Sequence, residues 1–411
     1  MEYQVFTLPN GIRLLYNPVI SSVTHTCIII NAGSRDEAQG KDGLAHFIEH
    51  LLFKKTEKRN TRQILNYLES VGGDLNAYTT KEYTCIHASI LTPYVNRALD
   101  LFQDLVFHST FPEDEMEKEK GVILDEIASY QDQPEEAIQD DFEDLIYRGH
   151  ELGRNILGTA ETVKSLQRKD LTDFLSNNYN TEEIAIGVMG NYDFKKLCTL
   201  FTQTFEAVPH NTGNKKRRPL PPYSALQKQE GKPINQTHCV IGNLAYSLHD
   251  NKRTGLSLLN NILGGNSMSS RLNMEIREKH GIAYTIESSY LAFTDTGLFS
   301  IYFGTDAEKA SKALSLVNKE LKKLREAKLT ESTLAKAKKK FTGQIALGEE
   351  NRLNLIITMT KCLIDYGKAD TLEEVFEKVN AVSSDQVLEI ANEVFDPSKL
   401  TSLTFEPGAE D

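Results

Sequence analysis

The sequence has few cysteines, and none of them is arranged as a metal or redox motif. Five occur among the 411 residues, at positions 27, 85, 198, 239 and 362, and no two form a C-x-x-C pair. An odd number of scattered cysteines argues against a disulfide framework and favours reduced thiols. We therefore expect a cytoplasmic protein, with Cys27 and Cys85 buried because they lie in strand-like runs.

Long apolar runs and phosphate-binding motifs are also missing. No stretch approaches 18 uninterrupted apolar residues, so no membrane-spanning helix is expected, and residues 1–6 show no signal-peptide pattern. No G-x-x-x-x-G-K-[ST] loop occurs. The formal net charge of −12 argues against nucleic acid or an anionic membrane as a partner. The apolar content of 40% is that of an ordinary globular protein.

A change in composition divides the chain. Residues 213–234 are rich in Asn, Gly, Lys, Arg and Pro, which predicts a linker between a first domain of residues 1–212 and a second of residues 235–411. The linker contains the basic tetrad of residues 215–218. We interpret this tetrad as solvated, because no aromatic or amphipathic context suggests a recognition patch.

The pattern of strands and helices repeats between the two halves. Asn10-Gly11 between two strand-like runs predicts a hairpin near the beginning. Two strands followed by a long helix are predicted at residues 74–107 and again at residues 283–324. The repeat predicts two similar α+β domains, each a mostly antiparallel sheet packed with helices, as a duplicated sandwich.

The strongest chemical signal is His46-Phe47-Ile48-Glu49-His50. On a helix, His46 and His50 lie one turn apart on the same face, so both imidazoles can bind one metal ion. Glu49 lies close enough to act as a general base. This H-x-x-E-H order is the inverse of H-E-x-x-H and predicts a zinc hydrolase, most typically a peptidase. The alternative is a surface helix with two solvated histidines.

A catalytic zinc ion usually has three protein ligands, so one more is needed. The helix predicted near residues 113–130 offers Glu119 and Glu126, which are two turns apart and share a face. The acidic residues at 113–119 could simply decorate a solvated helix. Glu126 lies between apolar residues and is expected closer to the core, where a carboxylate needs a partner.

Residues 33–37 and 43–56 carry a resemblance that extends beyond the pentapeptide. They resemble the signature of the inverzincin family, which includes pitrilysin, insulin-degrading enzyme and the mitochondrial processing peptidases, and the chain is most similar to its short bacterial members. The resemblance implies one zinc ion per chain, bound by His46, His50 and Glu126. It also implies that Glu119 supports the site without binding the ion, and that Glu49 is the general base.

Two further segments extend the same resemblance. Residues 73–79 match the family's edge strand, in which Asn76 and Ala77 would pair with an extended peptide through the backbone. Residues 263–272 and 277–284 match a second signature. The resemblance implies that its Arg277 and Tyr284 contact the substrate near the scissile bond.

The expected function is a zinc-dependent endopeptidase that hydrolyses peptides or small unfolded proteins inside a dimeric chamber. Because this chain carries both signatures, we expect a homodimer in which each site combines zinc from one protomer with Arg277 and Tyr284 from the other. One alternative is a non-catalytic or heteromeric partner subunit, although such relatives typically lose zinc ligands. Another alternative is a maturation protease for one peptide precursor.

Overall fold

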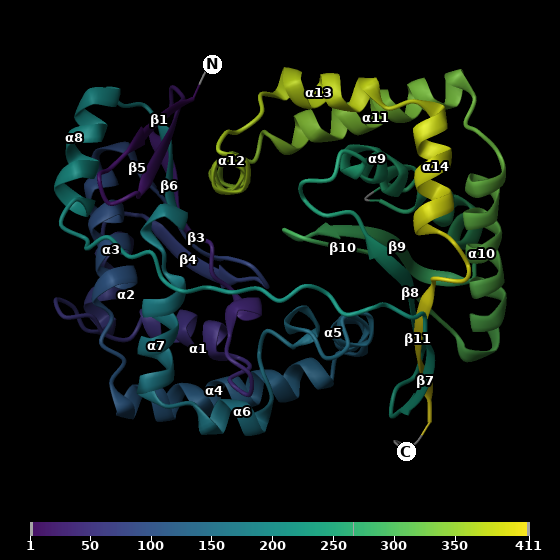
Figure 1. Ribbon diagram of the computed structural model, residues 1–411, viewed down its shortest axis with the longest axis horizontal. Helices are drawn as coiled ribbons and strands as arrows, with labels where there is room; N and C mark the ends of the chain where they lie inside the picture. The colour runs from purple at the N-terminus through teal and green to yellow at the C-terminus, as the bar shows by residue number, and fades with distance from the viewer. Residues whose placement is uncertain (1–2, 266, 409–411) are drawn as a thin grey trace. The chain divides into compact units, whose positions relative to one another are not determined.

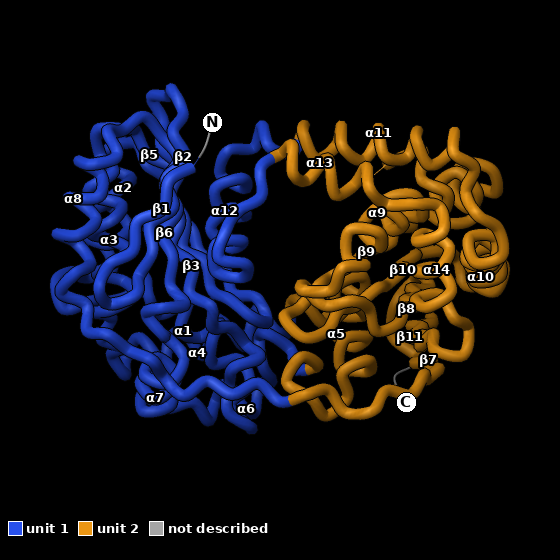
Figure 2. Tube along the Cα trace, turned by 45° about the horizontal axis from the view of Figure 1, so that its top comes forward, with its two compact units in different colours: residues 1–128, 154–218, 348–371 blue, residues 129–153, 219–347, 372–411 orange. Residues whose placement is uncertain are grey.

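The computed structural model describes residues 3–265 and 267–408 of the chain. It contains two compact units, each assembled from three stretches of sequence (Figure 2). Unit 1 comprises residues 1–128, 154–218 and 348–371, and unit 2 comprises residues 129–153, 219–347 and 372–411. Within the described residues, no helix is both long and apolar enough to cross a membrane.

Unit 1 is built on a six-stranded sheet with the order β1-β2-β6-β3-β5-β4 (Figure 1). Its strands are β1 (Gln4–Thr7), β2 (Arg13–Pro18), β3 (Val23–Ile30), β4 (Asp74–Thr79), β5 (Thr84–Leu91) and β6 (Ile184–Gly190). Strands β2 and β6 run parallel, and the other neighbours are antiparallel. Strands β1 and β2 form the predicted hairpin, and Gly11 in its turn has a φ of 92°, which favours glycine.

Helices cover both faces of this sheet. The main core lies between one face and helices that include the motif helix α1 (Leu44–Leu52). The opposite face, including Cys27 and Ile29, packs against α12 (Arg352–Tyr366). The other elements of unit 1 are η1 (Ser34–Asp36), α2 (Thr61–Glu69), η2 (Thr92–Tyr94), α3 (Val95–His108), α4 (Glu113–Gln131), α6 (Ala160–Ser165), α7 (Arg168–Asn178), η4 (Thr181–Glu183) and α8 (Phe194–Phe205).

Unit 2 is built on a five-stranded sheet with the order β7-β11-β8-β10-β9. Its strands are β7 (Gln227–Lys232), β8 (Thr237–Ala245), β9 (Ala283–Ala292), β10 (Gly297–Thr305) and β11 (Thr401–Pro407). One face packs against α5 (Pro134–Ile146) through a cluster that includes Phe142. The other elements are η3 (Glu151–Gly153), α9 (Arg253–Leu263), η5 (Asn273–Glu278), η6 (Ala307–Lys309), α10 (Ala310–Glu326), α11 (Glu331–Gly348), α13 (Leu372–Ala381) and α14 (Ser384–Val394).

The two sheets share one topology. In chain order, strands β2 to β6 of unit 1 correspond to strands β7 to β11 of unit 2. With this correspondence, the five strands have the same spatial order in both sheets. The pair at one end, β2 with β6 or β7 with β11, is parallel in each. The edge strands β4 and β9 are therefore equivalent. This arrangement confirms the predicted duplication of one α+β architecture.

The two units do not correspond to two consecutive halves of the chain. Helix α5 precedes the predicted linker but packs on β8 and β11 of unit 2, and α12 follows the linker but packs on β3 and β6 of unit 1. Each sheet thus has one face covered by a helix from the other half of the sequence (Figure 2).

The segment predicted as a linker is more structured than expected. Residues 227–232 form β7, and part of the basic tetrad is bound by carboxylates elsewhere in unit 1. Lys215 Nζ lies 2.5 Å from Glu183 Oε2, and Arg217 forms ion pairs with Asp36 and Glu82. The side chain of Arg217 is only 14% exposed. The interpretation of the tetrad as solvated is therefore wrong for these two residues, because they satisfy carboxylates of unit 1.

Candidate metal centre

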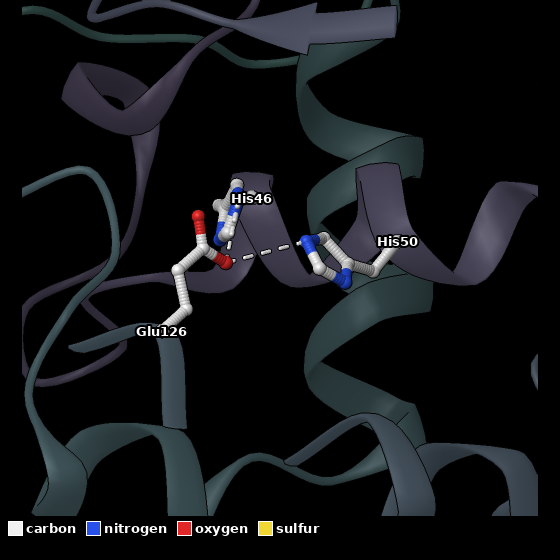
Figure 3. A group of neighbouring side chains, drawn as sticks. All are labelled: His46, His50 and Glu126. Atoms are coloured by element: carbon white, nitrogen blue, oxygen red, sulfur yellow. Dashed lines mark ion pairs between the residues drawn. The ribbon is translucent and has the colours of Figure 1, made fainter. Parts of the chain in front are cut away.

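Helices α1 and α4 bring three metal-binding side chains together in unit 1. Each of His46, His50 and Glu126 offers a ligand atom, and these atoms all lie within 4.8 Å of one another. Glu126 Oε2 lies 3.8 Å from His46 Nε2 and 3.6 Å from His50 Nε2 (Figure 3). The structure thus places the two predicted histidines and the more distant glutamate around one point.

The donor set fits zinc. Two ligands bound at about 2.0–2.1 Å to a tetrahedral ion lie about 3.3 Å apart, so the observed separations need only a small adjustment. Both separations from Glu126 are longer than a hydrogen bond, so direct bonding between the side chains does not explain their convergence. Two imidazoles and one carboxylate are also a known ligand set of catalytic zinc.

Glu119 orients His50 from the side away from Glu126. His50 Nδ1 lies 3.0 Å from Glu119 Oε2. Because an ionised carboxylate only accepts hydrogen bonds, this contact places the imidazole proton on Nδ1 and leaves the lone pair of Nε2 for a metal. The other oxygen of Glu119 lies 2.6 Å from Lys54 Nζ, and the Glu119 side chain is 8% exposed. Lys54 therefore neutralises the buried carboxylate of Glu119, which contacts His50 on the side away from Glu126.

His46 is held in the form that binds metal. It is buried, and burial together with the nearby His50 lowers the pKa of His46 from 6.5 to about 4. The imidazole is consequently neutral at neutral pH, as metal ligation requires.

Glu49 is poised as a base beside the three ligands. Burial raises the pKa of Glu49 above its usual value, and a hydrogen bond from Thr79 opposes the rise. The hydroxyl of Thr79 donates to Glu49 Oε2 at 2.6 Å. Thr79 is the last residue of β4, so the edge strand also holds the carboxylate in place.

The predicted substrate strand lies where an extended peptide could pair with it. Strand β4 is at the edge of its sheet and is hydrogen-bonded to β5 on one side. Asn76 is exposed and Ala77 half-buried, and Asn76 Oδ1 accepts the N–H of Ala77 at 2.8 Å. Strand β4 also contacts α1, so the edge runs beside the motif helix.

Arg277 and Tyr284 belong to unit 2, where both side chains are exposed. Arg277 lies in η5, a π-helical segment, and Tyr284 lies near the beginning of edge strand β9. The register between β9 and β10 shifts there, so Ala283 and Thr285 have partners and Tyr284 is the extra residue of a bulge. Tyr284 is 61% exposed. π-Helical turns and bulges are frequent at functional sites because they redirect side chains.

The expected burial of Glu126 is wrong. Its side chain is 32% exposed, whereas that of Glu119 is 8% exposed. The apolar residues before Glu126 do not form a core-facing run, since Val122 is 48% exposed and only Ile123 is fully buried. Burial therefore does not distinguish the residue that faces the histidines, whereas the family resemblance does.

Sequence reasoning also missed two supporting residues, Thr79 and Lys54. Neither carries a local pattern that indicates its role, because the partner of Thr79 is 30 positions away and that of Lys54 is 65 positions away. Lys54 lies four residues after His50 and just beyond the end of α1 at Leu52. Its place directly after the motif helix is therefore the one sequence signal for its role.

Models of two protein-family domains match most of the chain. Residues 16–160 match the insulinase domain of peptidase family M16, and residues 165–341 match the domain described as the peptidase M16 inactive domain. The cluster of His46, His50 and Glu126 lies in the first match. Among the described residues, the second match contains no comparable group of metal-binding side chains.

Relatives and solved structures agree with these matches. The chain is 34% identical over 394 residues to the protein named uncharacterized zinc protease YmxG of Bacillus subtilis, covering 95% of each. It is 30% identical over 404 residues to an uncharacterized zinc protease of Rickettsia bellii, covering 98% of this chain and 97% of the relative.

Two crystal structures share the fold. One is a protease from Helicobacter pylori, with a TM-score of 0.90, 22% identity and 99% coverage of both chains. The other is described as a peptidase M16 inactive domain from Pseudomonas fluorescens, with a TM-score of 0.92, 20% identity and coverage of 100% of this chain and 99% of that one. The domain matches and the relatives confirm the resemblance: the chain belongs to peptidase family M16, the insulinase family.

Proposed function

We propose that the protein is a zinc-dependent endopeptidase with one ion per chain, bound by His46, His50 and Glu126. The observation that carries the proposal is the convergence of these three ligand atoms beside Glu49, a half-buried carboxylate held by Thr79. The names of the curated relatives as zinc proteases support it. A cytoplasmic location stays a prediction, based on the five scattered cysteines.

The residues of the chain have separate roles in hydrolysis. Bound zinc would supply a Lewis acid that acidifies water and stabilises negative charge. Glu49 accepts the proton of the attacking water and returns it to the leaving amine. The raised pKa of Glu49 suits this task, because a base with a pKa closer to neutrality can also act as the acid. The edge of β4 aligns the peptide backbone.

Arg277 and Tyr284 would complete the site from a second copy of the chain. The Tyr284 hydroxyl can donate to the oxyanion of the tetrahedral intermediate, and the guanidinium of Arg277 can bind a substrate carbonyl or carboxylate. Their exposure in unit 2 leaves both side chains accessible. We therefore propose a twofold homodimer with two active sites in a chamber.

Peptide cleavage tests the proposed activity. Zinc-loaded protein is incubated with peptides of graded length, and the products are read by mass spectrometry. Internal cleavage by the wild type and none by Glu49→Gln supports the endopeptidase and gives the size limit. Zinc binding without cleavage of any peptide would instead favour the non-catalytic subunit, and cleavage of one sequence only would favour a maturation protease.

Subunit mixing tests the dimer. Glu49→Gln and Tyr284→Phe, each inactive alone, are combined under conditions that allow exchange of subunits. Because one mixed site would contain the intact Glu49 and the intact Tyr284, activity should return to a fraction of the wild-type value. Absence of recovery in a mixed dimer, verified by mass, would refute the shared site.

A further inference from the structure

The motif helix begins without a capping side chain of its own. Helix α1 starts at Leu44, and its N-cap residue is Gly43, which has no side chain to accept a hydrogen bond. The first turn of any helix has free N–H groups that need acceptors. His46 lies within this turn, so the way in which these groups are satisfied affects the position of a proposed zinc ligand.

Glu37 supplies the missing acceptors from outside the helix. Its Oε1 accepts the N–H of Ala45 at 2.8 Å, and its Oε2 accepts the N–H of Gly43 at 3.1 Å. Glu37 is 4% exposed, so water does not provide an alternative partner. One carboxylate thus binds two amides at the beginning of the helix. One of them, the amide of Ala45, belongs to the residue directly before His46.

The beginning of the helix is also confined sterically. Gly43 has a φ of 91°, and a Cβ at this position would lie 2.5 Å from the carbonyl oxygen of Leu157. The helix therefore starts against the backbone of a neighbouring loop, where only glycine fits. Glu37 contacts the same start through its carboxylate, so both constraints act on one turn.

Glu37 is itself held on both sides. Arg154 donates from one terminal nitrogen to the backbone carbonyl of Glu37 at 3.0 Å, and its Nε lies 3.3 Å from Asp42 Oδ1. The preceding residue, Asp36, pairs with Arg217 at 2.9 Å. The segment that presents the capping carboxylate is therefore tied to two other parts of unit 1, at Arg154 and Arg217.

We propose that Glu37 is a positioning residue for the zinc site: its carboxylate fixes the start of α1, and with it the direction of His46, Glu49 and His50. This inference rests on the proposed zinc site. Burial raises the pKa of Glu37, whereas the amides of Ala45 and Gly43 and the charge of Arg154 favour its ionised form. The helix dipole likewise favours an anion at this N-terminus. Glu37 itself is not one of the three proposed metal ligands.

The test compares Glu37→Gln with Glu320→Gln. Glutamine has the shape of glutamate but presents an NH₂ group to one of the two amides, so one hydrogen bond is lost. Glu320 is a buried carboxylate of unit 2, paired with Arg271 and Lys323, and it serves as a matched control for the loss of a buried charge. Zinc affinity is measured by competition with a chelator, the visible spectrum with Co²⁺ in place of zinc, and amide exchange over residues 43–50 in metal-free protein.

Glu37→Gln is expected to weaken zinc binding by about 10–100-fold, as for other residues that orient metal ligands. It should also alter the Co²⁺ spectrum and accelerate amide exchange over residues 43–50. Glu320→Gln should change none of the three. Zinc affinity and exchange in Glu37→Gln equal to those of the wild type would overturn the inference.

A milder variant covers the case in which Glu37→Gln does not fold. Glu37→Asp keeps the charge but is shorter by one methylene, so weakened zinc binding with faster exchange in this variant supports the inference, and wild-type values overturn it. If the wild type binds no zinc, the proposed function fails. Exchange in the metal-free protein then still decides whether Glu37 holds the helix.

Discussion

The hydroxyl of Thr79 donates a 2.6 Å hydrogen bond to Glu49, so the strand proposed to bind substrate also holds the proposed base. Thr79→Val removes this donor while keeping the shape of the side chain. Because the bond favours the ionised carboxylate, its loss should raise the pKa of Glu49 further. We expect a kcat lower by about tenfold and an acidic limb of the pH–rate profile shifted to higher pH.

The pH dependence of kcat and the zinc content measure the effect of Thr79→Val. Zinc content should stay at the wild-type level, because Thr79 contacts none of the three ligands in the described contacts. Thr199→Val, at a helix position where the hydroxyl bonds only the carbonyl of Lys195, is the control. An acidic limb at the wild-type pH in Thr79→Val would contradict the assigned role.

Lys54→Met should weaken zinc binding without removing a ligand. The change leaves Glu119, which is 8% exposed, without its ion pair and loosens its hold on His50. We expect a loss of about tenfold in zinc affinity. Chelator competition measures it, with Lys118→Met, whose lysine is 62% exposed and paired with Glu115, as the control. Equal affinities in the two variants would rule out the supporting role of Lys54.

The metal-free protein should lose stability in mild acid because of His46. The pKa of His46 is about 4 in the folded chain and 6.5 as a free side chain. Between these values the unfolded chain binds a proton that the folded chain does not, so stability is complete above pH 6.5 and falls as the pH drops toward 4. The contribution is at most about 3 kcal/mol.

Urea unfolding of metal-free protein at a series of pH values checks this. His46→Gln should reduce the dependence of the free energy of unfolding on pH between pH 6.5 and 4. His210→Gln, at a half-exposed histidine, should leave this dependence as in the wild type. If His46→Gln has the same pH dependence of the free energy of unfolding as the wild type, groups other than His46 cause the loss of stability in acid.

Arg217→Met should destabilise unit 1. The change removes one of the cations that pair with Asp36 and Glu82, two carboxylates that are almost fully buried. Breaking a buried ion pair from one side costs about 3–5 kcal/mol. Differential scanning calorimetry measures the loss as a lower Tm. The neighbouring Lys216 is exposed, so Lys216→Met should leave the Tm unchanged, and equal transitions in both variants would contradict the role of Arg217.

The parts of the fold that the sequence predicts correctly have local signals. Asn10-Gly11 defines a hairpin through turn geometry alone, and the helices and strands of the repeated segments follow from apolar periodicity. The two histidines of the site are also local, being one helical turn apart. Glu126 is 76 residues beyond His50, and only the family resemblance singled it out.

The parts that the sequence did not reveal depend on tertiary contacts. Strand β7 has the polar sequence Gln-Lys-Gln-Glu-Gly-Lys, which lacks the alternation of a half-buried strand because it lies at a sheet edge. The basic tetrad has the composition of a solvated segment, yet alternate residues face unit 1. Glu37 caps a helix that begins seven residues later, a spacing that differs from the local capping box.

The placement of α5 and α12 has a consequence for how this protein can be made and divided. A fragment that ends in the linker would lack α12 and expose Leu15, Ala185 and Met189 on its sheet, while the remaining fragment would lack α5 and expose Phe405. Neither fragment can shield its own apolar surface. Expression of the two halves as separate proteins would therefore leave apolar sheet surface exposed to water in both of them.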